Sequence, residues 1–364
     1  MALQAGIVGL PNVGKSTLFN ALTAAGADAA NYPFCTIEPN VGVVVVPDPR
    51  LEQLAAHVTT KEVVPTVVEI VDIAGLVRGA SEGEGLGNQF LGHIRNVDAL
   101  LHVVRCFEDP DVAHVDGTVD PLRDIATLRT ELILADLQSA ERRHDKWSKQ
   151  AKGVDREATA MATLFGAVAE RLADGNPACG GPWTDEQQAV LDAEGLLTTK
   201  PVLYVCNVDE AGLSDEPPAV GAVRDHAAAE GAGCVVLCGK LEAEIAELDP
   251  EDRAIFLEDV GLQEPGLNRL VRATYDLLGL QTFFTANENQ VHAWPVRKGA
   301  CAPEAAGVVH TDFERGFIRA EVYSVAALVE HGSEAALRGV GKLHVHGKDY
   351  VVQDGDVLKI RFNV

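Results

Sequence analysis

The chain has 364 residues, of which 47% are hydrophobic, and its formal net charge is −24. The length predicts two or three domains, and the composition supports a substantial core, which excludes a disordered chain. No run approaches the roughly 20 apolar residues of a membrane span, and the acidity opposes long-range attraction to nucleic acid, so we expect neither a membrane nor DNA as a partner.

The N-terminus and the cysteines bear on the compartment. The first residues lack the basic and then apolar stretch of a signal peptide, which predicts a cytoplasmic protein. The seven cysteines are an odd, scattered set without a CxxC pair. This pattern argues against a disulfide framework and against a zinc site.

The first predicted strand, over residues 5–8, runs into the sequence GLPNVGKST and then into an amphipathic helix. This GxxxxGK[ST] spacing is typical of a loop whose backbone N–H groups cradle nucleotide phosphates at a helix N-terminus. Lys15 is expected to reach the β- and γ-phosphates, and Ser16 to bind Mg²⁺. The residues expected to contact the nucleotide here are Asn12, Val13, Gly14, Lys15, Ser16 and Thr17. The glycine spacing does not fit the GxGxxG of a dinucleotide-binding site.

Two β-branched runs, at 41–46 and 66–72, predict buried strands of a mostly parallel sheet. The second run ends in the DxxG motif that begins at Asp72, a position from which a carboxylate can hold Mg²⁺ through water. Thr36, in the proline-bounded loop 31–40, is the candidate for a second Mg²⁺ ligand when a γ-phosphate is present. The alternative is a threonine in an ordinary surface loop.

The residue after the DxxG glycine is Leu76, where Ras-like proteins carry a glutamine that orients the attacking water. Because a leucine side chain cannot position water, hydrolysis needs another group. His114, in the polar loop that follows a predicted strand over 99–107, is our candidate. A solvated loop histidine is the alternative.

A further buried strand, at 201–206, ends in the sequence NVDE, in the place of the base-reading NKxD motif. Val208 replaces the lysine, and Glu210 stands where an aspartate would read guanine. The glutamate carboxylate is displaced by one C–C bond, so a preference for guanine is in doubt. Asn207 and Glu210 are the candidate base contacts, and a last strand is predicted over 234–238.

Residues 123–200 interrupt the sheet pattern with apolar stripes of helical spacing, which predict an antiparallel hairpin turning near Gly153. Thr184 and Gln187 resemble a capping box for a third helix. Basic residues gather around Trp147 near the hairpin tip: Arg142, Arg143, Lys146, Lys149, Lys152 and Arg156. This cluster is either an RNA-facing patch or a solvated helix face.

From residue 281 the pattern changes to short strands and turns. An Asp354-Gly355 turn precedes a strand in which Leu358, Ile360 and Phe362 alternate with charged residues, which predicts one core face and one wet face.

Taken together, the sequences GLPNVGKST, NYPFCTIEPN, DIAGLV and NVDE and the last 84 residues resemble the YchF subfamily of Obg-like P-loop NTPases. The resemblance implies an α/β fold with a parallel-sheet G domain, a helical, coiled-coil-like insertion and a C-terminal β-grasp TGS domain. The expected ranges are 1–122 and 201–280 for the G domain, 123–200 for the insertion and 281–364 for the TGS domain.

The resemblance also implies Mg²⁺-dependent ATP hydrolysis in preference to GTP, with Lys15 and His114 as catalytic residues. It implies association with the ribosome, through its large subunit or as a whole, and with rRNA through the insertion or the TGS domain. Redox regulation is associated with a switch-region cysteine, here Cys35, and Asn12 is a residue through which some related NTPases bind K⁺.

Two other functions stay open at this point. One is a true GTPase in translation or ribosome assembly, which would differ in the base that it binds. The other is an adaptor that binds nucleotide and the ribosome without hydrolysis, in keeping with Leu76.

Overall fold

The computed structural model describes residues 3–25, 40–73, 86–115, 117–151 and 155–363, which form two compact units. The first unit takes in 1–42 and 69–270, and the second takes in 43–68 and 271–364. The chain therefore passes between the units three times. The expected ranges placed 43–68 and 271–280 in the G domain, whereas the contacts group both segments with the C-terminal residues.

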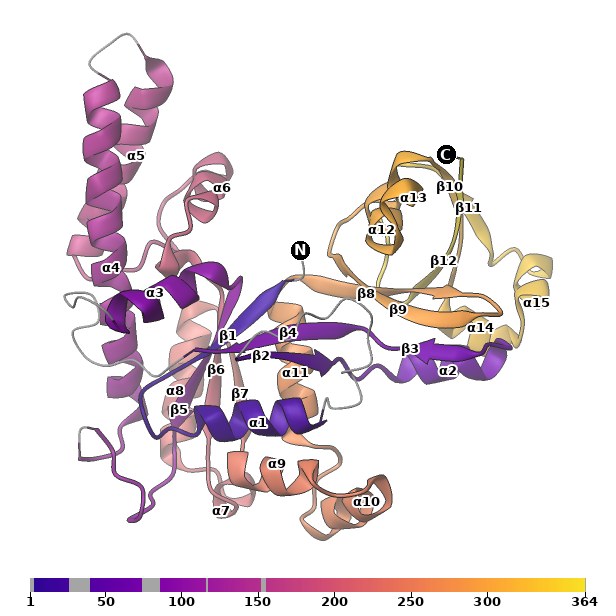
Figure 1. The fold of residues 1–364 in the computed structure, drawn as a ribbon, viewed down its shortest axis with the longest axis horizontal. Coiled ribbons are helices and arrows are strands. Elements are labelled where there is room, and N and C mark those ends of the chain that lie inside the picture. Colours follow the sequence, from indigo (N-terminus) through magenta and orange to yellow (C-terminus); the bar gives the residue numbers. More distant parts are fainter. Residues whose placement is uncertain (1–2, 26–39, 74–85, 116, 152–154, 364) are drawn as a thin grey trace. The chain divides into compact units, whose positions relative to one another are not determined.

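The first unit is built on a six-stranded sheet (Figure 1). Its strand order is β2 (Val41–Val45), β4 (Val67–Asp72), β1 (Gln4–Val8), β5 (Ala99–Arg105), β6 (Val202–Asn207) and β7 (Gly233–Leu237). The pairs of β1 with β4 and β5, and of β6 with β5 and β7, are parallel. All seven residues of β5 are buried, as expected for a parallel strand covered on both faces. The predicted α/β parallel sheet is confirmed.

Helices flank this sheet, and α4 packs against β5 and α8. The helices of this unit are α1 (Lys15–Ala25), α3 (Leu86–Asn96), α4 (Pro121–Gln150), α5 (Arg156–Ala173), α6 (Asp185–Ala193), the 3-10 turn η2 (Leu197–Thr199), α7 (Ala211–Ser214), α8 (Pro218–Glu230), α9 (Gly239–Ala246) and α10 (Pro250–Asp259). Helix α11 (Gly266–Leu277) begins in the first unit and ends in the second. Among the helices described, none combines the length and apolar character that a membrane crossing requires.

Helices α4 and α5 lie side by side as the predicted hairpin (Figure 1). Aspartates start both helices: the Asp120 side chain accepts from Arg123 N, and the Asp155 side chain accepts from Ala158 N. The predicted capping box of α6 is confirmed, because Thr184 and Gln187 exchange both side-chain-to-backbone hydrogen bonds. The expected turn at Gly153 lies outside the described residues.

The second unit is a six-stranded sheet with helices packed against it. The strand order is β11 (His344–His346), β10 (Phe317–Ser324), β12 (Asp356–Phe362), β8 (Leu280–Ala286), β9 (Gln290–Arg297) and β3 (Glu62–Val64). The helices are α2 (Pro49–His57), α12 (Ala302–Val309), α13 (Thr311–Arg315), α14 (Val325–His331) and α15 (Glu334–Gly339).

Residues 43–68 belong to this unit for two reasons. Leu51 and Leu54 of α2 are buried in one core cluster with Phe284 and Val291, and β3 pairs in parallel with β9. The sequence pattern shows α2 to be amphipathic but does not say which sheet it covers.

The last strand follows the predicted alternation only in part. Leu358 is buried, but Phe362 is 41% exposed although the pattern places it on the core face. It lies at the end of β12, where its ring packs on the ring of Phe313 in α13, with centroids 4.1 Å apart. Residues before the Asp354-Gly355 turn form a single bridge between Cys301 and Val351, not a strand.

Candidate nucleotide site

The loop between β1 and α1 has the backbone that a phosphate cradle needs. Asn12 and Gly14 adopt positive φ angles of 62° and 97°. A Cβ atom at Gly14 would lie 2.3 Å from Nδ2 of Asn207, so both the conformation and the close approach require glycine. The first helical N–H groups of α1 follow directly after this loop, at the positive end of the helix.

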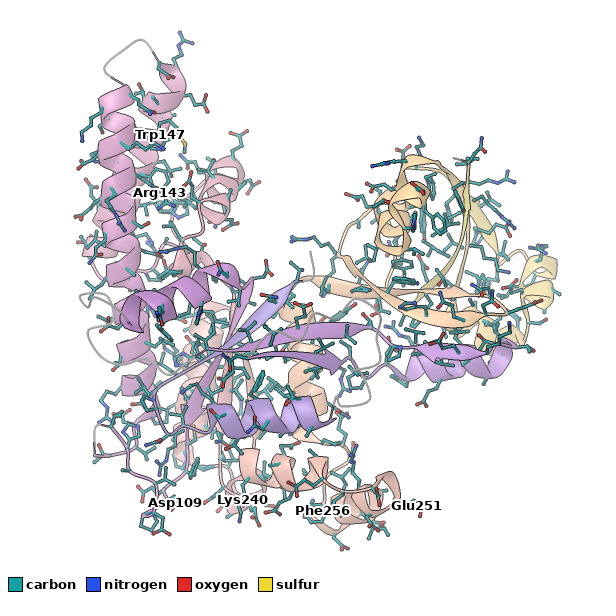
Figure 2. All side chains as sticks on the ribbon, viewed as in Figure 1. Asp109, Arg143, Trp147, Lys240, Glu251 and Phe256 are labelled. Atoms are coloured by element: carbon teal, nitrogen blue, oxygen red, sulfur yellow. The ribbon has the colours of Figure 1, made fainter. Side chains whose placement is uncertain are left out.

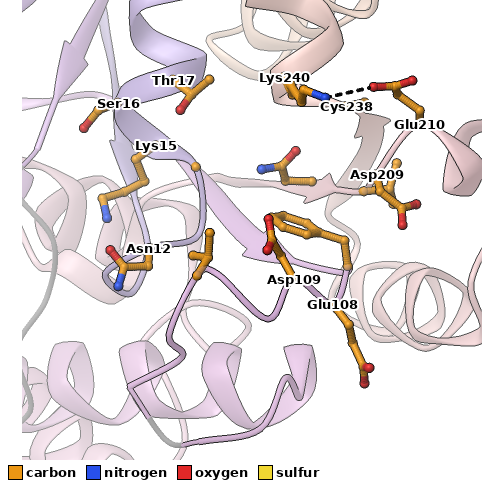
Figure 3. Close-up of a pocket in the computed structure, with 15 residues that line it drawn as sticks. Asn12, Lys15, Ser16, Thr17, Glu108, Asp109, Asp209, Glu210, Cys238 and Lys240 are labelled. Carbon is orange, nitrogen blue, oxygen red and sulfur yellow. Dashed lines mark hydrogen bonds and ion pairs between the residues drawn. The ribbon is translucent and has the colours of Figure 1, made fainter.

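A cavity of about 510 Å³ opens over this loop (Figure 3). It is lined by Asn12, Gly14, Lys15, Ser16, Thr17, Phe107, Glu108, Asp109, Val112, Asn207, Val208, Asp209, Glu210, Cys238 and Lys240. This lining includes every residue that the sequence predicts to contact the nucleotide, except Val13, whose side chain is buried. In Figure 3, Lys15 and Glu210 lie at opposite ends of this cavity.

Lys15 is 8% exposed, and its Nζ donates a 2.8 Å hydrogen bond to the carbonyl of Leu10. Burial lowers the pKa of Lys15 to about 8, and the nearby carboxylate of Asp72 opposes this shift. The ammonium group therefore lies beside the cavity, in an environment where a further negatively charged group would be stabilising.

Asp72 ends β4, and its Oδ1 is buried with no hydrogen-bond partner among the described residues. Burial raises the pKa of Asp72, and the charge of Lys15 lowers it. A buried carboxylate oxygen without a partner fits the oxygen donor set that Mg²⁺ takes, and Asp72 interacts with Lys15, which lines the cavity together with Ser16. Thr36, the other expected ligand, lies outside the described residues.

Asn207 joins two loops of the site. Its Nδ2 donates to the carbonyl of Val13 at 2.9 Å, and its Oδ1 accepts from the N–H of Gly239 at 2.9 Å. Both polar ends of this buried side chain are thus engaged with backbone, so the structure gives Asn207 a bridging position and not a free amide aimed at a base.

The base-reading end differs from a guanine site in two side chains. Val208 is buried in a core cluster, and Glu210 is exposed, with its Oε1 3.4 Å from Nζ of Lys240. Asp209, one residue out of register, accepts from the N–H of Gly212 at 2.8 Å. Of the three, Glu210 has an exposed carboxylate that lines the cavity.

His114 does not line the cavity. Its Nε2 lies 2.9 Å from Oδ2 of Asp124 on α4, and both side chains are at most 3% exposed. Its neighbour Ala113 accepts a 3.0 Å hydrogen bond from Nδ2 of Asn12. The backbone beside His114 therefore touches the phosphate loop while the imidazole turns away from it. Leu76 lies outside the described residues.

Sequence reasoning missed Arg105, at the end of β5. Its side chain is 1% exposed and donates to the carbonyls of Phe107, Asp109 and Val112, which follow it in the wall of the cavity. A charged residue at the end of a strand made mostly of apolar residues is a sequence signal that could have found it.

The basic cluster of the hairpin divides into packed and exposed members (Figure 2). Arg143 donates to the side chain and the carbonyl of Glu194, and its guanidinium lies over the Phe165 ring. Trp147 is half-buried and packs against the hairpin core. Arg142, Lys146, Lys149 and Arg156 are exposed, and Lys152 lies outside the described residues.

The comparisons with known proteins agree along the whole chain. Residues 4–157 match the family model described as "50S ribosome-binding GTPase", and residues 280–363 match YchF-GTPase_C, described as "Protein of unknown function (DUF933)". The Bacillus subtilis (strain 168) protein "Ribosome-binding ATPase YchF" is 53% identical over 100% of both chains. The chain belongs to the YchF family of Obg-like P-loop NTPases. The predicted family is thereby confirmed.

More distant YchF relatives keep the full length. "Obg-like ATPase 1" of Caenorhabditis elegans is 41% identical over 99% of this chain and 92% of its own. The solved structure titled "Structure of the Schizosaccharomyces pombe YchF GTPase" superposes with a TM-score of 0.88 at 34% identity, over 99% of this chain and 97% of that one. The fold is therefore shared along nearly the whole chain with a solved YchF structure.

Proposed function

We propose that this chain binds and hydrolyses ATP with Mg²⁺ and acts as a nucleotide-dependent switch that associates with the ribosome. The observation that carries the proposal is the phosphate-loop cavity with Lys15 buried at one end and Glu210 at the other. Bacterial relatives with half of their residues in common are named "Ribosome-binding ATPase YchF".

The preference for ATP follows from the base end of the cavity. Guanine presents two N–H donors that a correctly placed aspartate accepts together. Glu210 has a longer, exposed side chain that already pairs with Lys240, and Val208 turns into the core. In this arrangement no carboxylate accepts both N–H groups of guanine, so the gain in affinity that is specific to guanine is lost.

Mg²⁺ would be held by the hydroxyl of Ser16 and, through water, by Asp72, with Thr36 as the γ-phosphate-dependent ligand. A bound Mg²⁺ ion neutralises phosphate charge and orients the phosphates. Lys15 adds its own charge at the β- and γ-oxygens. We propose K⁺ as a further ion beside Asn12, which lines the cavity and whose Nδ2 donates to the carbonyl of Ala113.

For hydrolysis we propose His114 as the group that replaces the missing glutamine. The imidazole must leave Asp124 before it can orient a water molecule at the γ-phosphate. We also propose that oxidation of Cys35 alters the ATPase rate. Equal peroxide sensitivity of the wild type and Cys35→Ser would contradict this.

For the ribosome we propose that rRNA meets the exposed basic residues of the helical insertion, 123–200, or the C-terminal module, 281–364, as a TGS-type domain. The G domain would be 1–122 and 201–280. Within it, the segment 43–68 supplies α2 and β3, which pack in the second unit. Arg142, Lys146 and Lys149 are free to approach phosphates, since their side chains are exposed on α4.

The test is calorimetric titration of the nucleotide-free chain with ATP and with GTP in Mg²⁺, in K⁺ and in Na⁺. We expect ATP to bind at least tenfold more tightly, which is about 1.4 kcal/mol. Tighter GTP binding would assign the chain to the second candidate, a GTPase, which is what the similar Schizosaccharomyces pombe protein is called. An ATPase rate that survives Lys15→Ala would overturn the proposed hydrolysis.

A further inference from the structure

A second cavity, of about 80 Å³, lies in the first unit between the sheet and α4; we call it the α4 cavity. It shares no lining residue with the nucleotide cavity. Most of its wall is apolar and comes from β1, β5, β6, α4 and the segment 177–197: Val8, Leu100, Ile125, Leu128, Leu132, Pro177, Leu197 and Val202.

One polar group in this wall stands out. His102, in the middle of β5, is 4% exposed, and its Nε2 has no hydrogen-bond partner within the described part of the chain. Burial lowers the pKa of His102 to about 3, so the ring is neutral at physiological pH. Buried nitrogen atoms without a partner are rare in folded proteins, which indicates that something else meets Nε2.

The charged and hydroxyl groups around the cavity already satisfy one another. Tyr204 donates to Oε2 of Glu230 at 2.8 Å, and Glu230 is paired with Arg129. Lys200 donates to the carbonyl of Arg95 at 3.2 Å, and Thr198 donates to Asp136 at 2.7 Å. A charged ligand would have to break these pairs, so the cavity favours an uncharged one.

Water alone fits this space poorly. A single water molecule needs roughly 10–15 Å³ of cavity and two to four polar partners. The α4 cavity is several times larger, yet Nε2 of His102 is the one buried side-chain nitrogen or oxygen of its described lining that lacks a partner. Additional waters would have only each other and apolar walls as neighbours.

We propose that the α4 cavity is a binding site for a small uncharged molecule with an apolar body and one hydroxyl group, which bonds to Nε2 of His102. A hydroxyl both donates and accepts, so it suits either tautomer of the neutral ring. The body packs against Leu100 and Leu128. Cys179 and Glu230, which also line the cavity, are exposed to solvent, so a ring the size of phenol need not be wholly enclosed.

The test compares phenol with benzene, which lacks only the hydroxyl, by titration of the full-length protein. We expect phenol to bind at least about tenfold more tightly, because a site with an unpaired buried polar group rejects the analogue that cannot bond to it. In His102→Leu the preference should fall below twofold. Leu128→Phe, which fills the cavity, should abolish binding of both probes while ATP binding persists.

Tyr204→Phe is the matched control, since the Tyr204 hydroxyl is already engaged by Glu230, and it should leave the phenol affinity unchanged. Equal affinities for phenol and benzene, or phenol binding that survives Leu128→Phe, would overturn the proposal. The ¹⁵N resonance of His102 Nε2 in the wild type gives an independent readout if a variant fails to fold. A resonance that stays fixed throughout the phenol titration would show that the cavity holds only water.

Discussion

Nε2 of His114 lies 2.9 Å from Oδ2 of Asp124, with both side chains buried. The contact fastens the loop after β5 to the first turn of α4. If His114 acts on ATP, this contact must open in each catalytic cycle. The His114–Asp124 contact therefore slows the proposed hydrolysis.

Asp124→Asn should weaken the contact with His114, because it removes the carboxylate charge at nearly constant side-chain size. We expect the ATPase rate at saturating ATP to rise by up to about tenfold, or about 1.4 kcal/mol of activation free energy. Asp120→Asn is the control, since Asp120 caps the same helix through Arg123 N and asparagine caps equally well. An unchanged rate in Asp124→Asn would mean that the contact does not limit hydrolysis.

The pKa of about 8 at Lys15 predicts a pH dependence of nucleotide binding. The charged form binds phosphate, so the affinity for ADP should fall by up to tenfold per pH unit above pH 8. Folding lowers this pKa from 10.5, so the unfolded chain holds more protons between pH 8 and 10.5, and this lysine makes the free energy of unfolding rise with pH there.

Titrations of ADP from pH 6.5 to 9.5 check the binding effect. Lys15→Arg, which stays charged throughout, is the control and should show a flat profile at whatever affinity it retains. A wild-type profile that is equally flat would contradict the assignment of the pH dependence to Lys15.

Asn207→Ala should loosen the phosphate loop, since it removes the hydrogen bonds to Val13 and Gly239 together. We expect the free energy of unfolding to fall by about 1–3 kcal/mol, because two buried backbone groups lose their partner. Urea denaturation measures this change. Asn207→Asp keeps the acceptor for Gly239 and loses the donor to Val13, so it separates the two bonds. If both variants had the same free energy of unfolding as the wild type, the stabilising bridge from Asn207 to Val13 and Gly239 would be ruled out.

Gly14→Ala should reduce nucleotide affinity at least tenfold, because the new Cβ would meet Nδ2 of Asn207 at 2.3 Å in a backbone with φ of 97°. Gly92→Ala in α3 is the matched control. A Cβ there meets nothing within 4 Å, so this helical substitution should stabilise the chain by about 0.5–1 kcal/mol. Calorimetry with ADP and thermal unfolding check both variants.

The basic residues of α4 should separate in their effects. Arg142→Ala with Lys146→Ala should weaken cosedimentation with ribosomes, because both side chains are exposed. Arg143→Ala should instead lower the melting temperature, since it removes the contacts to Glu194 and Phe165. Ribosome binding that is lost only in Arg143→Ala would reverse these roles.

The phosphate loop could be predicted from sequence because its backbone is encoded locally, by Gly14 and by the strand and helix on either side. The same holds for the variant base motif around Glu210. The polar partners could not be predicted, since the residues that meet Asn207 lie 194 and 32 positions away. The sequence places Arg143 in a cluster that faces either RNA or solvent, because no local pattern shows that Glu194, 51 residues later, meets it.

The apolar spacing of α2 likewise shows a buried face without saying what buries it. A fragment that starts at residue 271 lacks α2 and β3, so it leaves the apolar surface around Phe284 and Val291 uncovered and exposes an edge of β9. A chain that stops at residue 270 keeps α2 and β3 without the sheet that they complete. Neither unit is one contiguous segment of the chain, so neither can be transferred intact to another protein by a single cut at residue 270.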